Sequence, residues 1–170
     1  MKQNLLILTF LLFSFTEANC QKVKNIKITE PEFSGTAVFV NDTIGNGILL
    51  EQQTAAMGKV KLRSKETSLE VNDCCSIVFA DTINSQFIVR VPDNSINPYD
   101  VISIIKMNIE NTKRTWKISN PETVEFKTKK YGTSSYLISV PKFAIGQYGI
   151  YFKNTYTVNL FGIKLIKENF

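Results

Sequence analysis

Residues 136–152 read YLISVPKFAIGQYGIYF, and this stretch contains the clearest structural pattern in the chain. Its first part, 136–140, alternates core-type and outward-facing side chains, as a strand with one buried face does. Pro141 interrupts it, because proline has no amide hydrogen for a strand interior. A second apolar run begins at Gly146. The stretch therefore predicts a strand, a corner over 141–145 and a second strand.

This corner resembles the penultimate corner of immunoglobulin-like β-sandwiches. In those domains a leucine in the turn is followed by glycine and tyrosine, and the tyrosine hydroxyl caps backbone groups across the corner. Phe143, Gly146 and Tyr148 hold the corresponding places here. Gly146 and Tyr148 are thus candidate structural residues. The alternative is an ordinary hairpin with an aromatic side chain on its buried face.

Elsewhere in the chain, apolar residues recur with period two, and turn residues interrupt them about every ten positions. No long segment keeps a helical period, so we predict an all-β, single-domain immunoglobulin-like β-sandwich, with a small antiparallel β-barrel as the alternative. The domain is expected over 31–170, preceded by a lead-in or edge strand over 21–30. The expected strands are 36–41, 48–53, 59–63, 68–71, 76–80, 86–91, 101–109, 114–118, 123–127, 136–140, 147–152 and 157–164. The strand over 101–109 is apolar on both faces and is expected to be central in its sheet.

The N-terminus has the order of a secretory signal peptide. Lys2 precedes an apolar run over 5–13, and a more polar stretch follows as far as Cys20. The run is shorter than the roughly 20 apolar residues that span a bilayer, so no transmembrane span is expected. We expect cleavage after Cys20, which makes Gln21 the first residue of a periplasmic or secreted protein. The alternative is an outer-membrane lipoprotein anchored at Cys20.

The composition limits the chemistry. The chain has no histidine, which is the usual general base of nucleophile triads and the commonest zinc ligand. Its formal charge is +5, but lysines such as Lys59 and Lys61 alternate with apolar residues, as on the solvent face of a strand. Weak binding to an acidic glycan is the alternative, and export argues against nucleic acid. We expect no cofactor and no enzymatic activity.

After removal of the signal peptide, the remaining thiols are the neighbours Cys74 and Cys75. Two adjacent cysteines cannot supply an ordinary disulfide framework within one chain. Neighbouring residues of a strand point to opposite faces, so we expect one core cysteine and one exposed thiol. A strained vicinal disulfide at a turn and a metal or redox role are the alternatives.

Carboxylates are the catalytic groups that a hydrolase without histidine would use, and they would have to be paired. The acidic residues are scattered along the sequence, and their spacing selects no pair. The loop over 93–100 has the oxygen-rich composition of a calcium-binding turn but lacks the EF-hand order of ligands. A plain turn between two strands is the preferred interpretation. The sequence therefore selects no catalytic or metal-binding residue.

Several longer stretches resemble a group of exported Bacteroidetes proteins that have a single β domain. They are EPEFSG at 30–35, LEQQTA at 50–55, FIVRVPDN at 87–94, KKYGTSSYL at 129–137, GQY at 146–148 and LFGI at 160–163. Together they extend over most of the expected mature chain. The resemblance implies an exported domain and supplies no catalytic residue.

Three classes of function remain open. The first is a non-enzymatic interaction or structural domain of the cell envelope or extracellular space, whose partner would be an envelope or extracellular protein or a glycan. The second is a binder of a small apolar or glycan ligand, and the third is a carboxylate-dependent hydrolase. The aromatic residues available for a ligand platform are Phe126, Tyr131, Tyr136, Tyr151, Tyr156 and Trp116. The sequence does not specify the oligomeric state.

Overall fold

The computed structural model describes residues 28–41, 45–58 and 67–164. In these ranges the chain forms strands and one short helix, α2 (Pro98–Val101), which confirms the predicted all-β class. The expected signal peptide over 1–20, the cleavage site, Cys20 and the expected strand over 59–63 lie outside the described residues. No helix within the described ranges is long and apolar enough to cross a membrane.

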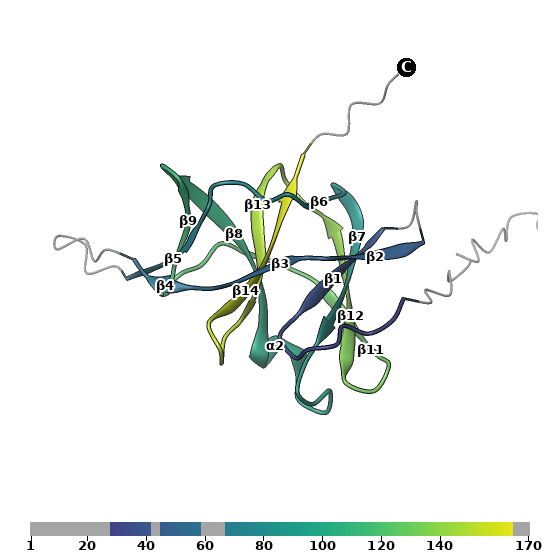
Figure 1. Ribbon diagram of the computed structural model, residues 1–170. Coiled ribbons are helices and arrows are strands. Elements are labelled where there is room, and N and C mark those ends of the chain that lie inside the picture. Colours follow the sequence, from purple (N-terminus) through teal and green to yellow (C-terminus); the bar gives the residue numbers. More distant parts are fainter. Residues whose placement is uncertain (1–27, 42–44, 59–66, 165–170) are drawn as a thin grey trace, which may run out of the picture.

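Two sheets pack against each other (Figure 1). The first has five strands in the order β11-β12-β7-β1-β2, all paired antiparallel. Their bounds are β11 (Lys127–Tyr131), β12 (Ser135–Lys142), β7 (Ile83–Arg90), β1 (Ala37–Asn41) and β2 (Asn46–Leu49). Lys127, Lys129 and Lys130 are exposed on β11, at one end of this strand order. Charges at such a position discourage edge-to-edge pairing with another chain.

The second sheet has the order β3-β14-β13-β8-β9-β5-β4, with β10 beside β8 and β6 beside β14. The bounds are β3 (Glu51–Thr54), β14 (Thr157–Ile163), β13 (Gly146–Phe152), β8 (Ile102–Glu110), β9 (Lys113–Lys117), β5 (Ser68–Asn72), β4 (Ala56–Met57), β10 (Thr123–Val124) and β6 (Phe79–Ala80). Only Ala55 separates β3 from β4, although these strands stand at opposite ends of the order. The sheet therefore curls round and nearly closes on itself.

The strand order is that of an immunoglobulin-like sandwich. In the usual letters, β11-β12-β7-β1 corresponds to D-E-B-A, and β14-β13-β8-β9 corresponds to G-F-C-C′. The segment between β1 and β7 is an insertion that contributes β2 to the first sheet and β3, β4, β5 and β6 to the second. This insertion closes the second sheet, so the protein combines the predicted sandwich with a barrel-like sheet.

Each face of the second sheet has its own core. Ile102 and Ile104 of β8 belong to the first core, between the two sheets, whereas Ile105 and Met107 belong to the second core, inside the curled sheet. Both faces of β8 are therefore buried, which is why its sequence is apolar on both sides. As predicted, β8 is an inner strand, with β13 on one side and β9 and β10 on the other.

The first core is rich in aromatic rings. Phe87 of the first sheet packs against Phe161 of the second, with their ring centroids 4.8 Å apart. Tyr148 also stacks on Phe161, at 5.7 Å between centroids and 19° between ring planes. The Tyr148 hydroxyl donates to the carbonyl oxygen of Ala144, four residues upstream, at 2.9 Å. This bond crosses the corner between β12 and β13, and the buried Phe143 of the corner packs against the Tyr148 ring.

The first described residues are attached to the β11–β12 turn. Glu30 accepts hydrogen bonds from the backbone amides of Thr133 (2.7 Å) and Ser134 (3.1 Å) and from the Ser135 hydroxyl (2.6 Å). These bonds lower the pKa of Glu30 to about 2, despite the opposing effect of desolvation, which is the largest single contribution. Gly132 has φ +58°, and a Cβ atom there would lie 2.0 Å from the Glu30 carboxylate. Residues 28–30 form no strand.

Several predicted strands differ from the structure. The expected strand over 48–53 bends at Leu50, because its two halves belong to different sheets. Of the segment 76–80, only the last two residues pair, as β6. The expected strand over 123–127 shortens to β10, and β11 follows it as a separate strand in the other sheet. These errors share one cause, since local alternation does not show where a chain passes from one sheet to another.

Candidate functional site

A surface groove of about 330 Å³ lies beside β8. It opens where β10 leaves β8, because the pairing ends at Val124, opposite Ile104. Helix α2 forms the other wall. The lining residues are Tyr99, Ile102, Ser103, Ile104, Thr123, Val124, Glu125 and Phe126.

Tyr99 is the most distinctive residue of the groove. The Asn97 side chain caps α2 by accepting from the Tyr99 amide (3.3 Å), and Pro98 occupies the first turn. The Tyr99 hydroxyl donates to the carbonyl oxygen of Phe126 (3.2 Å), and the two rings pack with centroids 5.0 Å apart. Lys153 donates to the Tyr99 carbonyl oxygen (2.8 Å). Although its backbone, ring and hydroxyl are all held by these contacts, Tyr99 remains 48% exposed.

The groove combines an aromatic wall with a polar rim. The two rings supply apolar surface, and Ser103, Thr123 and Glu125 supply hydroxyl and carboxylate groups. Glu125 is the one carboxylate among the lining residues. A groove with this lining can hold one ring-sized group and hydrogen-bond at its edges. It does not present the carboxylate pair that glycoside hydrolysis uses.

Most of the aromatic residues considered for a platform are not brought together. Trp116 is buried in the second core and packs edge-on against Tyr151, with centroids 5.6 Å apart. Tyr136 is also buried, and its hydroxyl lies 2.6 Å from the carbonyl oxygens of Asn94 and Ile96. Tyr131 instead hydrogen-bonds with the backbone of Ile28. Tyr156 is exposed in the β13–β14 turn.

Phe126 alone of that set lines the groove, and its partner Tyr99 was missed. The sequence signal was present, because Asn97-Pro98 is a helix start that fixes the direction of the following residue. In the sequence these residues were interpreted only as part of a plain turn between two strands. Within this loop, Asp93 accepts from the amide (2.8 Å) and hydroxyl (2.6 Å) of Ser95, which is the geometry of a plain turn. Among the described residues, no group of three or more potential metal ligands comes together.

Two of the acidic residues form ion pairs with lysines. Glu122 pairs with Lys106 at 2.8 Å, and Glu70 pairs with Lys113. Glu70 and Lys113 lie on the neighbouring strands β5 and β9, whereas Glu122 precedes β10 and pairs with Lys106 of β8. The Glu122 carboxylate raises the pKa of Lys106. Both acids are therefore engaged with lysines, and the Glu70–Lys113 pair links two strands of the second sheet.

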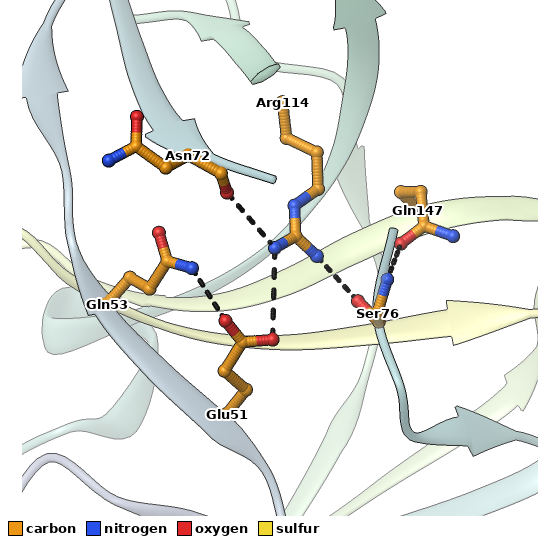
Figure 2. Close-up of polar contacts among 6 residues, drawn as sticks. All are labelled: Glu51, Gln53, Asn72, Ser76, Arg114 and Gln147. Atoms are coloured by element: carbon orange, nitrogen blue, oxygen red, sulfur yellow. Dashed lines mark hydrogen bonds and ion pairs between the residues drawn. The ribbon is translucent and has the colours of Figure 1, made fainter. Parts of the chain in front are cut away.

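A second polar cluster surrounds Arg114 at one end of the curled sheet (Figure 2). Arg114 and Trp116 are two residues apart in β9, so their side chains lie on the same face of the strand and point into the second core. Arg114 is 0% exposed. Its guanidinium donates to the Ser76 hydroxyl (2.6 Å) and to the Asn72 carbonyl oxygen (3.4 Å), and lies 4.0 Å from the Glu51 carboxylate.

The Arg114 guanidinium is incompletely satisfied. Its Nε has no hydrogen-bond partner among the described residues. Burial lowers the pKa of Arg114, and the nearby Glu51 and Asp73 carboxylates oppose this effect. None of these residues was a candidate on the basis of the sequence alone. The available signal was the position of Arg114 two residues before Trp116 in a predicted strand, which places the two side chains on one face.

Cys74 and Cys75 lie in the segment 73–78, which covers the cluster. The interpretation as one core cysteine and one exposed thiol is wrong for Cys74, which is only half-buried, whereas Cys75 is exposed. The physical reason is that 73–78 is not a strand, so alternation between two faces does not apply. Asp73 has a left-handed φ of 63°, which turns the chain after β5. The Cys75 thiol interacts with the Cys74 side chain, and this raises the pKa of Cys75.

Comparison with known proteins adds no relative. No family model matches the chain, and no match was found among curated proteins or among solved structures. The groove and the Arg114 cluster are therefore interpreted from their own geometry and chemistry.

Proposed function

We propose that this chain is an exported, non-enzymatic interaction domain that binds its partner through the groove beside β8. The observation that carries the proposal is the exposed Tyr99 ring, held against Phe126 by packing and a hydrogen bond. Export rests on the signal-peptide pattern of residues 1–20. The partner is an envelope or extracellular protein or a glycan.

The prior fixation of Tyr99 supports a binding role. An aromatic ring that is already immobile loses little conformational entropy when a partner covers it. Tyrosine is also among the residues that contribute most to binding at interfaces, because it combines a large apolar ring with a polar end. The groove volume of about 330 Å³ is near the lower end for small-molecule sites, so it suits one protruding group of a larger partner.

A glycan is the second candidate occupant, and the polar rim favours it. A sugar ring would lie on the exposed Tyr99 ring, while Ser103, Thr123 and Glu125 are placed to hydrogen-bond its hydroxyl groups. A protein partner would instead insert an aromatic or aliphatic side chain. The two candidates predict different dependence on these residues, because only the sugar requires several polar contacts at once.

A photo-crosslinking experiment tests the proposal. A benzophenone amino acid is placed at Glu125 in the groove, and at Glu110 at the far end of β8 as a matched exposed control. In producing cells, we expect a discrete adduct from position 125 that is lost on Tyr99→Ala and is absent from position 110. Equal labelling from both positions, or an adduct unaffected by Tyr99→Ala, would overturn the proposal.

Calorimetric titration with cell-wall oligosaccharides separates the two occupants. If the partner is a glycan, we expect heat of binding that falls with Tyr99→Ala and, to a smaller extent, with Ser103→Ala. If the partner is a protein, the titration stays flat while the crosslinked adduct persists and is digested by protease.

A further inference from the structure

The segment 73–78 is fixed at its end by Val78, whose carbonyl oxygen accepts from the Gly162 amide (2.9 Å), and in its middle by Ser76. The Ser76 amide donates to the Gln147 side chain (3.0 Å), and its hydroxyl accepts from Arg114 (2.6 Å). Ser76 is buried, although both its neighbours, Cys75 and Ile77, are exposed. A change in the backbone next to Ser76 therefore acts directly on the hydrogen bonds of the buried guanidinium (Figure 2).

Two thiols lie immediately before Ser76, on neighbouring residues of a segment that is not a strand. Their side chains interact, which raises the pKa of Cys75. Both are near enough to Arg114 for its charge to interact with theirs. Because Cys75 is exposed, a solution disulfide can reach its sulfur.

We propose that Cys74 and Cys75 are a reversible redox pair, and that closure of a disulfide between them loosens Ser76 from Arg114 and Gln147. In the first step the deprotonated fraction of the exposed Cys75, which its raised pKa keeps small at neutral pH, attacks a small-molecule disulfide, forms a mixed disulfide and releases one thiolate. In the second step the Cys74 thiolate attacks the Cys75 sulfur and releases the second thiolate. Two electrons pass to the external disulfide, and the two cysteine protons go to solvent.

The covalent geometry explains why this bond would be reversible and would move Ser76. Adjacent Cα atoms are about 3.8 Å apart across a trans peptide, whereas disulfides prefer roughly 4.4 to 6.8 Å. A bond between neighbours therefore strains the backbone, and strained disulfides are the more easily reduced ones. The adjustment falls on the flanking residues, of which Asp73 already has a left-handed φ of 63° and Ser76 carries the anchoring bonds.

Loosening of Ser76 would act on the Arg114 guanidinium, whose hydrogen-bond donors are already incompletely satisfied. Arg114 is buried with an unpartnered Nε, so loss of the Ser76 bond leaves a second donor position unsatisfied. Water or an anion would then enter this end of the curled sheet to solvate the guanidinium. Reduction of the pair would restore the covered state.

The experiment uses the full chain with Cys20→Ser, equilibrated in graded mixtures of reduced and oxidised glutathione. Intact mass after alkylation reports the state of the pair. We expect a species that lacks two hydrogens, carries no glutathione and takes no alkyl group, and that disappears as the buffer becomes reducing. If the chain yields only glutathione adducts or interchain dimers, the redox pair is refuted. Cys74→Ser serves as the matched control, because it can form only those products.

Hydrogen exchange at the Ser76 amide tests the coupling separately. In the oxidised protein we expect exchange at this amide to be roughly three- to tenfold faster, the factor that corresponds to one lost hydrogen bond. The Tyr148 amide in the sandwich core should not change. Oxidation that leaves the Ser76 rate unaltered would refute the coupling, and the same acceleration in oxidised Cys74→Ser would show that a closed pair is not required.

Discussion

The two faces of the second sheet differ in how their cores end. The first core is closed by another sheet, and its large buried side chains, such as Phe87, Ile104 and Phe161, are apolar. The second core is closed by the sheet's own curvature, and Arg114 stands at its end with Ser76, Glu51 and Asn72 around it. A sheet that curls on itself leaves an open end, which is covered here by a loop and polar side chains.

This difference implies two kinds of stability. Burial of apolar surface depends little on pH or redox state, because it needs no particular partner atom. A buried guanidinium contributes favourably only while its partners stay in place, since an unpaired charge in the interior is costly. The stability of the first core is thus expected to change little with pH or redox state. The stability of the Arg114 end of the second core is expected to depend on whether its polar partners stay in place.

The largest expected effect comes from truncating adjacent residues that face the two cores. Leu160 and Phe161 are neighbours in β14, and each is 0% exposed. Phe161→Ala should lower the free energy of unfolding by about 3 to 5 kcal/mol and Leu160→Ala by about 2 to 5 kcal/mol, from lost burial and the remaining cavity. Urea unfolding followed by circular dichroism measures both. A single shared transition would show that the two cores unfold together, whereas a separate early transition in Leu160→Ala would show that they do not.

A smaller effect is expected at the Glu51–Arg114 ion pair, where loss of the partly exposed acid should destabilise the protein more than loss of the buried base. Glu51→Gln removes the carboxylate that faces Arg114 and should cost about 1 to 2 kcal/mol, less than a fully buried pair because Glu51 is partly exposed and 4.0 Å away. Arg114→Met removes the buried charge itself and fills its space with a flexible side chain, so it should cost less than Glu51→Gln. The midpoints of urea unfolding at pH 7 compare the two. A greater loss from Arg114→Met would mean that the guanidinium is a net source of stability.

These two regions also differ in how far the sequence predicts them. The residues of the first core follow from alternation and from the corner motif around Tyr148, because local pattern decides which face of a strand is buried. The second core could not be derived in the same way. It depends on β3 and β4 reaching opposite ends of one sheet, and nothing local in LEQQTA at 50–55 records that contact.

The candidate site shows the same division. Asn97-Pro98 predicts the local turn that carries Tyr99, but the approach of Phe126 depends on a contact across the fold. Likewise, Cys74 and Cys75 were recognisable as an unusual pair, while the bond between the following Ser76 and Arg114 depends on a contact across the fold. In both places the sequence shows the unusual residues, but their contacts with distant parts of the chain become visible only in the folded structure.

The hydrogen bond from the Tyr148 hydroxyl to Ala144 can be removed without leaving a large cavity, so its contribution to the stability of the first core can be measured. Tyr148→Phe keeps the ring and removes the hydroxyl that donates to Ala144. The expected cost is about 1 kcal/mol, the usual net value of one hydrogen bond plus the unpaired carbonyl. Tyr156→Phe, in an exposed turn, is the matched control and should change the unfolding midpoint little. Equal effects from the two variants would contradict a structural role for the corner bond.

An effect that depends on pH is expected at Glu30. Glu30→Gln should cost about 1 kcal/mol at pH 7, because the amide oxygen replaces an ionised acceptor at a partly exposed site. The folded-state pKa of about 2 lies below the ordinary value of 4.5. The carboxylate therefore contributes its stability fully above about pH 4.5, and the contribution is lost as the pH falls toward 2.

The difference between wild type and Glu30→Gln isolates this contribution, since all other carboxylates titrate in both proteins. It should be constant from pH 7 to 5 and shrink steadily between pH 4.5 and 2, as measured by urea unfolding at each pH. Glu32→Gln, two residues away and exposed, should show no such trend. A difference that grows on acidification would mean that Glu30 is held in its neutral form, which its four hydrogen-bond donors do not favour.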